Sequence, residues 1–533
     1  MGADQPLKST RRQFLLGAAA AAAAALTPWR RLGELGRGGA RLTGSIVGAS
    51  QRLGHRLRAG GLPAPSAEER KTVVIVGGGM AGLSAGWRLL RAGLTDFTIL
   101  DLEEQFGGNS RWGENAVSAY PWGAHYVPFP SPESRAVSQL LRELSVEIGR
   151  DRGRPVYDER YVCFAPSERL FAHGRWQEGL FPRLGATNDD LRQFHSFMEA
   201  MARYRRARGP DGRKAFAIPM EYSSRGAEFL ALDQISMAEF LRRDGWTSPR
   251  LRWFVEYACR DDFGTTLEGT SAWAGVHYFA ARGEGHDDQV LTWPEGNGWI
   301  ARRLETIVSA QRRASALAFN IDHDASGALV DYWDDRLGKT VRLRARQVVV
   351  CLPQFAADHV VARRRGKKPT TFEYAPWMVA NLTVHRPPAG HGAAPAWDNI
   401  LYDSPSLGYV RATHQSLSQD ARSSVWTYYM SLTGAEPGVA RRQAYERSWS
   451  EWTSMILGDL SRPHQGLVEH VSNIDVMVWG HGMIAPLAGF MWGQARQEAA
   501  RSIGPIHFGH SDLSGFSIFE EAQYRGIKAA EAA

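Results

Sequence analysis

Residues 71–111, KTVVIVGGGMAGLSAGWRLLRAGLTDFTILDLEEQFGGNSR, determine the class of fold. Residues 72–76 are β-branched and uncharged, which is typical of a strand buried on both faces. Closely spaced glycines follow, then apolar residues at helical spacing, and then a second apolar run, Phe97–Leu100, that ends on Asp101. This order of strand, glycine turn, helix and strand predicts a Rossmann-like unit that binds a dinucleotide.

The glycines of this stretch have the G-x-G-x-x-G spacing of a dinucleotide site. Gly77 permits a tight turn, Gly79 lets a pyrophosphate approach the backbone, and Gly82 lets the helix pack on the strand. The first turn of the helix, which contains Met80 and Ala81, offers free N–H groups and the positive end of the helix dipole to phosphates. The sequence therefore predicts where the phosphates bind.

The acid and the second glycine pair that follow this motif distinguish between cofactors. Asp101 lies nineteen residues after the last glycine of the motif, where a carboxylate accepts hydrogen bonds from ribose hydroxyls. Six residues later come Gly107 and Gly108, followed by Asn109 and Arg111. The pair resembles the second fingerprint of FAD proteins of the glutathione-reductase-like class, and most of all the flavin-containing amine oxidase superfamily. The resemblance implies an FAD cofactor.

The resemblance also implies the fold class and the domains. The fold class is α/β, with a Rossmann-like FAD-binding domain plus an α+β substrate domain that has a mixed sheet and helices. We assign residues 71–130, 291–373 and 481–533 to the FAD-binding domain. Residues 131–290, mainly helical, and 374–480 form the substrate domain.

The first 28 residues are typical of an export signal. Arg11 and Arg12 match the twin-arginine pattern, and an alanine-rich apolar run follows them. This run is too short and too weakly hydrophobic for a membrane span, which needs about 20 apolar residues. The twin-arginine route carries folded proteins, so it suits a protein that takes up its flavin before export. We expect a periplasmic or other extracytoplasmic protein that contacts a membrane only if the signal remains uncleaved as an anchor.

Residues 29–70 are rich in Gly, Arg, Ala and Pro, and we expect a flexible connector there. Residues 1–70 hold eleven basic and four acidic residues, which accounts for the net charge of +7 of the whole chain. The rest of the chain is formally neutral, which argues against a nucleic-acid partner. Cys163, Cys259 and Cys351 lack C-x-x-C spacing, so we expect buried small residues rather than a disulfide framework or a metal site.

Residues 112–130 resemble the segment that passes beside the flavin ring in the superfamily. Gly123 and Ala124 are small enough to let the backbone approach the flavin. His125 is a candidate catalytic base, although a hydrogen-bonded structural histidine is the favoured interpretation.

Two later segments complete the resemblance. The C-terminal residues 506–530 are similar to the terminal strand, glycine turn, acid and helix of the superfamily, and Asp512 takes the place of the acid that bonds the ribityl chain. The alternating run 379–384 resembles the floor of the substrate cavity, where amine oxidases commonly place a lysine bridged by water to flavin N5. We place Asn381 at that position, and its lack of charge favours dehydrogenase over oxidase behaviour.

Aromatic and acidic residues are candidates for the substrate site. A cationic substrate would favour carboxylates such as Asp261 or Asp262 near an aromatic wall, although a salt-bridged loop is the commoner explanation of such a cluster. Candidates for the wall beside the ring are Trp479, His481, Trp492 and Tyr126.

The motifs therefore imply an exported FAD-dependent oxidoreductase. The leading hypothesis is an amine (polyamine-type) oxidase or dehydrogenase that transfers hydride from a small-molecule substrate to flavin N5, with a redox protein or quinone as a possible acceptor. The candidate catalytic residues are His125, Asn381, Trp479 and His481. The alternatives are a desaturase-like dehydrogenase that acts on a C–C bond, and an FAD-binding protein without substrate turnover.

Overall fold

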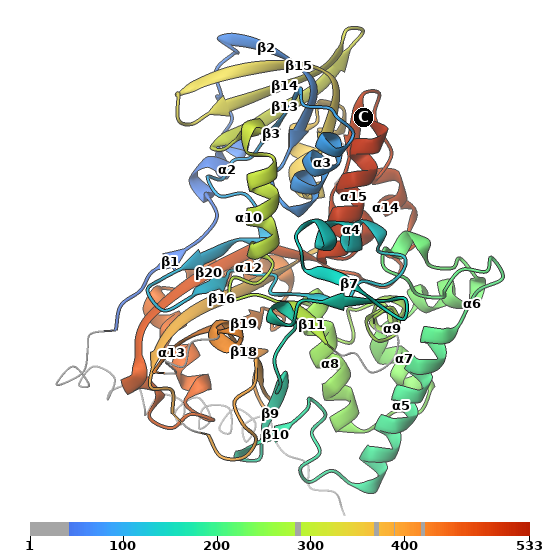
Figure 1. Ribbon diagram of the computed structural model, residues 1–533, viewed down its shortest axis with the longest axis vertical. Coiled ribbons are helices and arrows are strands. Elements are labelled where there is room, and N and C mark those ends of the chain that lie inside the picture. Colours follow the sequence, from blue (N-terminus) through green and yellow to red (C-terminus); the bar gives the residue numbers. More distant parts are fainter. Residues whose placement is uncertain (1–41, 283–288, 367–371, 389, 417–421) are drawn as a thin grey trace, which may run out of the picture. The chain divides into compact units, whose positions relative to one another are not determined.

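The structure is a computed structural model that describes residues 42–282, 289–366, 372–388, 390–416 and 422–533. The predicted export signal lies outside the described residues, as does the first part of the predicted connector. Residues 44–533 form one unit, which contains two large sheets (Figure 1).

The first sheet belongs to the predicted FAD-binding domain and follows the order β12-β3-β2-β15-β14-β13, with β21 paired to β15. Strands β2, β3, β15 and β21 run parallel. Val73 and Ile75 of β2 pack on one face, and Val74 and Val76 on the other, so the predicted strand is buried on both faces. The strands of this sheet are β2 (Ala67–Val76), β3 (Phe97–Leu100), β12 (Arg312–Arg313), β13 (Ala316–Asp324), β14 (Gly327–Asp334), β15 (Lys339–Val350) and β21 (Ile506–Phe508).

Helices α3 (Met80–Arg91), α10 (Gly298–Ile307) and α15 (Phe519–Ala532) pack with this sheet (Figure 1). A Cβ atom on Gly526 of α15 would lie 2.0 Å from the Ala81 carbonyl oxygen of α3. Glycine inside a helix costs about 1 kcal/mol relative to alanine, and here it allows the two helices to approach closely.

The second sheet has eight strands in the order β1-β20-β16-β19-β18-β17-β9-β10. β16, the third strand in this order, lies between β20 and β19 and is antiparallel to both. The predicted boundary between residues 480 and 481 falls inside β20 and is corrected, because this strand continues to Ile484. The strands are β1 (Ile46–Val47), β9 (Glu168–Ala172), β10 (Arg175–Glu178), β16 (Tyr374–His385), β17 (Asp398–Leu401), β18 (Gly408–Arg411), β19 (Ser423–Ser431) and β20 (Val471–Ile484).

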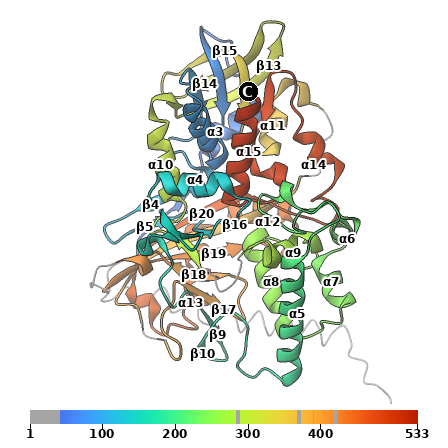
Figure 2. The same ribbon diagram turned by 45° about the vertical axis from the view of Figure 1, so that its right-hand side comes forward.

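The other helices include the group α5–α9, which Figure 2 shows on one side of the second sheet. The segment that contains Asp261 and Asp262 is not a loop as expected. It forms the last turns of α8, with Gly264 (φ 67°) as the cap. These helices are α4 (Arg135–Glu143), α5 (Asn188–Arg206), α6 (Ala227–Leu230), α7 (Met237–Arg243), α8 (Pro249–Phe263), α9 (Ala272–Ala280), α11 (Gln354–Val360), α12 (Pro437–Glu446), α13 (Trp449–Leu460) and α14 (Gln494–Ala499). Short strand pairs are β4 (Trp112–Glu114) with β5 (Ala119–Pro121), β6 (Tyr126–Pro128) with β11 (Val290–Thr292), and β7 (Glu147–Asp151) with β8 (Arg154–Tyr157).

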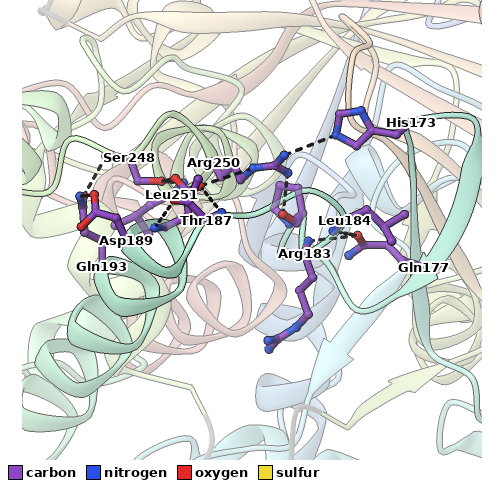
Figure 3. A network of polar contacts seen from close by, with 12 residues as sticks. His173, Gln177, Arg183, Leu184, Thr187, Asp189, Gln193, Ser248, Arg250 and Leu251 are labelled. Atoms are coloured by element: carbon purple, nitrogen blue, oxygen red, sulfur yellow. Dashed lines mark hydrogen bonds and ion pairs between the residues drawn. The ribbon is translucent and has the colours of Figure 1, made fainter.

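A polar network joins the N-termini of α5 and α8 (Figure 3). Thr187 and Asp190 form a capping box at the start of α5. Asp190 also accepts a hydrogen bond of 2.6 Å from the Ser248 hydroxyl, which caps α8. Arg250, in the first turn of α8, contacts His173 beyond β9 at 3.5 Å. The network therefore fixes these helices to each other and to the second sheet.

The described part of the predicted connector is folded, so that prediction is corrected from residue 44 on. It contains β1, the helix α2 (Gln51–Ala59) and the start of β2. The three cysteines are buried, as predicted. Within the described residues, no helix is both long enough and apolar enough to cross a membrane.

Candidate active site

The glycine loop between β2 and α3 has the shape of a phosphate cradle. Gly77 has φ +106°, and a Cβ there would lie 2.5 Å from the Cys351 carbonyl oxygen. A Cβ on Gly82 would lie 1.8 Å from the Gly77 carbonyl oxygen, so Gly82 serves packing. A Cβ on Gly79 would lie 3.8 Å from its nearest neighbour beyond the adjoining residues, the Gly108 Cα, because Gly79 faces a cavity. The first N–H groups of α3 have no hydrogen-bond partners within the helix. The first residues of this helix, Met80 and Ala81, line the same cavity.

Asp101 is held at the end of β3, next to the glycine loop. Its carboxylate accepts hydrogen bonds from the backbone N–H groups of Gly78 (2.6 Å) and Glu103 (2.7 Å). Burial raises the pKa of Asp101 to about 6, against the lowering effect of these two hydrogen bonds. The carboxylate still has lone pairs for further donors, and Asp101 lines the same cavity as Gly79.

This space, here called the cofactor cavity, brings most of the predicted site residues together. It extends from Asp101 past the glycine loop to Gly482 of β20 and Phe519 of α15. Its glycine cradle and the carboxylate of Asp101 fit a dinucleotide such as FAD. Predicted residues that line it are Gly77, Gly79, Met80, Ala81, Asp101, Gly107, Gly108, Asn109, Arg111, Ala124, Trp479, His481 and Asp512.

Asp512 faces the cofactor cavity as an ionised group. The Tyr374 hydroxyl donates to it at 2.5 Å, and the Gln354 N–H donates at 2.9 Å. His510 lies 3.1 Å from the other carboxylate oxygen. Burial would raise the pKa of Asp512, but His510 and these hydrogen bonds lower it below its ordinary value. The sequence indicated the acid but not its partners. Tyr374 lies 138 residues away in the chain, and nothing in the C-terminal motif marks His510 as a partner.

His481 lies against the cofactor cavity rather than the substrate side. Its ring stacks on Phe355 with the centroids 4.2 Å apart. Burial, together with Arg441 and Arg58, lowers the pKa of His481 to about 4, so the imidazole is neutral near pH 7. A neutral ring can contact the cofactor without adding charge.

A second cavity, here called the substrate cavity, adjoins the first. Aromatic side chains of Tyr126, Trp377, Tyr429 and Trp479 line it. Trp479 is fixed there because its indole N–H donates to the Trp122 carbonyl at 2.7 Å. Residues that line both cavities are Asn109, Ala124, Trp479, Gly482, Ser517, Ile518 and Phe519. A molecule in the substrate cavity would therefore meet the far end of a bound dinucleotide.

Acidic groups outnumber basic groups on the wall of the substrate cavity. Asp261, Asp262 and Glu520 line it together with Arg282. Arg282 pairs with Asp262 at 2.7 Å, as the salt-bridge interpretation of this cluster anticipated. Burial raises the pKa of Asp261 to about 7, with a further contribution from Asp262. Burial also raises the pKa of Glu520 to about 7, although Arg282 opposes the rise.

Glu520 was missed by the sequence analysis. It is 4% exposed and lies in the first turn of α15. Its neighbour Glu521 accepts a hydrogen bond from the backbone N–H of Met220. By contrast, no side chain among the described residues donates a hydrogen bond to Glu520 or to Asp261. The pair of adjacent acids at the start of the last helix was the available signal. The two carboxyl groups are thus available to a ligand.

His125 lines the substrate cavity but is held in place by its neighbours. Its ring lies 4.7 Å from the Tyr429 ring and 5.2 Å from the Tyr126 ring. Nδ1 is 3.4 Å from the Gly123 carbonyl oxygen. Burial lowers the pKa of His125 to about 4. This environment makes His125 a weak base and agrees with the structural interpretation. Gly123 packs under Asn109, where a Cβ would lie 2.3 Å from the Asn109 carbonyl oxygen.

The placement of Asn381 beside the flavin was wrong. Asn381 is 3% exposed and lines neither cavity. Its amide donates to the Pro121 carbonyl at 3.0 Å, and its oxygen accepts from the Thr427 hydroxyl at 2.7 Å. Trp377 and Val379, earlier on the same face of β16, line the substrate cavity instead.

Two further points follow from the lining of the cavities. Among the described residues, no lysine lines either cavity. Trp492 was also misplaced, because it packs against Trp273 at 5.4 Å in a separate core.

Comparisons with known sequences identify the nucleotide-binding part. The family model of the NAD(P)-binding Rossmann-like domain matches residues 75–144. A Baeyer–Villiger monooxygenase from Stachybotrys chlorohalonatus is 48% identical over 52 residues, which cover 10% of this chain and 8% of that protein. The chain thus matches only a small part of the length of this curated relative.

Solved structures match a much larger part of the chain. Wild-type putrescine oxidase bound to putrescine has a TM-score of 0.64 and 15% identity, over 87% of this chain and 99% of that chain. Cyclohexylamine oxidase from Brevibacterium oxydans has a TM-score of 0.61 and 16% identity, over 87% and 98%. A fatty acid isomerase from P. acnes has a TM-score of 0.60 and 14% identity, also over 87% and 98%. The chain therefore has a Rossmann-like nucleotide-binding segment, and most of its length shares the fold of these solved structures. This α/β fold agrees with the fold class that the motifs implied.

Proposed function

We propose that this protein is an FAD-dependent oxidoreductase that oxidises small cationic amines. The FAD assignment is supported by the Rossmann-like match, the glycine cradle and the fold. The amine assignment depends on one observation: the cavity next to the cofactor cavity combines aromatic walls with three carboxyl groups and a single paired arginine. Fold alone would not select it, because one of the matching structures is a fatty acid isomerase.

The aromatic walls and the carboxyl groups suit an ammonium group. Aromatic faces attract cations, with an energy of about 0.5–2 kcal/mol per contact. Asp261 and Glu520 would add charge-assisted hydrogen bonds, worth about 1.5–3 kcal/mol each. An acyl chain would gain nothing from these buried carboxyl groups and would have to compensate for their desolvation.

The same carboxyl groups can prepare the amine for oxidation. An amine must lose its ammonium proton before a hydride can leave the neighbouring carbon. Burial holds the pKa of Glu520 near 7, which makes its carboxylate a better proton acceptor than an ordinary glutamate. When bound, FAD supplies the hydride acceptor at N5. The chain itself binds and orients the amine, receives its proton and excludes water with the rings of Tyr126, Tyr429 and Trp377.

The location and the electron acceptor are further parts of the proposal. The twin-arginine pattern of the sequence supports export to the periplasm. The absence of lysine among the described lining residues supports an acceptor other than oxygen, such as a quinone or a small redox protein.

A matched pair of variants on one helix tests the amine proposal. Glu520→Gln should raise KM for primary amines about 10- to 100-fold, the loss expected for one charge-assisted hydrogen bond, and should alter the pH profile between pH 6 and 8. Glu531→Gln, on the exposed end of α15, is the control and should behave as wild type. Oxidation of an amine panel with a dye acceptor measures both. Unchanged KM and pH profile in Glu520→Gln would refute the role of this carboxylate.

A further inference from the structure

Residues 44–59, here called the strap, run from the second sheet to the first beside the cofactor cavity. Its first half joins the second sheet. Ile46 and Val47 form β1, which pairs in parallel with β20. The backbone N–H of Ser45 donates to the Asp475 carboxylate at 3.0 Å. At Gly44 the chain lies so close that a Cβ would be 1.9 Å from the Ile474 carbonyl oxygen.

The second half of the strap is α2, which is attached to the first sheet (Figure 1). Arg52 pairs with Asp335 at 2.6 Å, and Arg56 lies 3.8 Å from the same carboxylate. The Arg56 guanidinium also lies 4.3 Å from the centre of the Trp333 ring. Leu53 is 2% exposed and anchors the apolar side of the helix.

Between these two attachments the strap forms part of the cavity wall. Ala49 lines the cofactor cavity. The backbone N–H of Ser50 donates to the Glu103 carboxylate at 2.7 Å, and the Glu103 N–H in turn donates to Asp101. The crossing point therefore lies next to the carboxylate that faces the ribose in a dinucleotide site.

We propose that the strap is a cofactor-binding segment of this chain, which closes the ribose end of the cofactor cavity and slows the release of FAD. None of the glycine or acid motifs includes it. The inference depends on the FAD assignment but not on the amine substrate. FAD could leave at this end only while the strap is open, so the release rate reports how often the strap detaches by local unfolding.

The polar attachments of α2 allow a direct test in the full-length holoprotein. The double variant Arg52→Ala/Arg56→Ala removes the ion pairs and the cation–π contact. Loss of these contacts should increase the equilibrium constant for detachment of the strap about 10-fold. FAD release, followed by flavin fluorescence after dilution, should be about 10-fold faster. Arg242→Ala removes an exposed pair on α7 far from the strap and should leave release unchanged.

A second variant removes a single hydrogen bond. Ser50 has φ −69°, which proline adopts without strain. Ser50→Pro therefore removes the N–H that reaches Glu103, together with a hydroxyl that makes no capping hydrogen bond to α2. It should also release FAD faster, while the melting temperature of the FAD-free protein stays near that of wild type. Wild-type release rates in both strap variants would overturn the proposal. The proposal would also be overturned if these variants destabilised the FAD-free protein and released FAD no faster than that loss of stability explains. Purified protein without FAD would instead refute the cofactor assignment.

Discussion

Replacement of Gly79 by valine should separate cofactor binding from folding. Gly79 has φ −69° and ψ −176°, which L-residues adopt freely, and the nearest atom to an added Cβ is 3.8 Å away. The FAD-free protein should therefore fold as well as wild type, or gain about 0.4–1 kcal/mol through the loss of unfolded-state freedom. The valine side chain would instead enter the cofactor cavity, where the pyrophosphate has to approach the backbone.

The expected loss of FAD affinity follows from the contacts that valine would block. If two backbone N–H bonds to phosphate are lost, at about 1.5–3 kcal/mol each for charged partners, affinity falls by about 10²- to 10⁴-fold. Titration of the FAD-free protein with FAD, followed by flavin fluorescence, measures this change. Thermal unfolding of the FAD-free protein measures the fold.

Gly82→Ala is the contrasting variant, because its Cβ would lie 1.8 Å from the Gly77 carbonyl oxygen. It should destabilise the FAD-free protein itself. Wild-type FAD affinity in Gly79→Val would refute the placement of the pyrophosphate at this loop.

The remaining predictions concern charge, register, export and the electron acceptor. The pKa of Asp261 is raised to about 7 in the folded state, so its ionisation destabilises the fold as pH rises from about 4 to about 7. Asp261→Asn should therefore raise the melting temperature more at pH 8 than at pH 4. Equal effects on the melting temperature at the two pH values would contradict the raised pKa. Asn381→Ala should lower stability by about 1–3 kcal/mol through its lost hydrogen bonds without slowing flavin reduction, whereas slowed reduction would restore Asn381 to the site. Replacement of Arg11 and Arg12 by lysine should leave the protein in the cytoplasm, as cell fractionation would show, and normal export would indicate another route. Turnover with a dye acceptor should exceed turnover with oxygen alone, and equal fast rates would exclude the dehydrogenase proposal.

The parts of the site that depend on short-range backbone geometry could be predicted from the sequence. The bounds of β3 and the tasks of Gly77 and Gly82 follow from steric rules within one βαβ unit, and the structure agrees with them. The close approach of α15 to α3 likewise depends on a glycine inside a helix, Gly526, which the sequence shows directly.

Features that depend on long-range packing could not be predicted. A slip along β16 keeps the alternation of buried residues, so the pattern could not determine whether Val379 or Asn381 lies at the cavity. The strap has no strong apolar pattern, because it is held by polar contacts to distant residues such as Asp475 and Asp335. The burial that raises the pKa of Glu520 arises only when α15 packs into the finished fold.

The measurement that tests the central proposal most directly is the absorbance of the bound flavin under anaerobic conditions. The purified holoprotein would be mixed in turn with a primary diamine, a primary monoamine and an unsaturated fatty acid. We predict that an amine bleaches the oxidised flavin spectrum, that the fatty acid does not, and that Glu520→Gln slows the bleaching. Bleaching by the fatty acid alone, or by none of these compounds in a protein that holds FAD, would contradict amine oxidation.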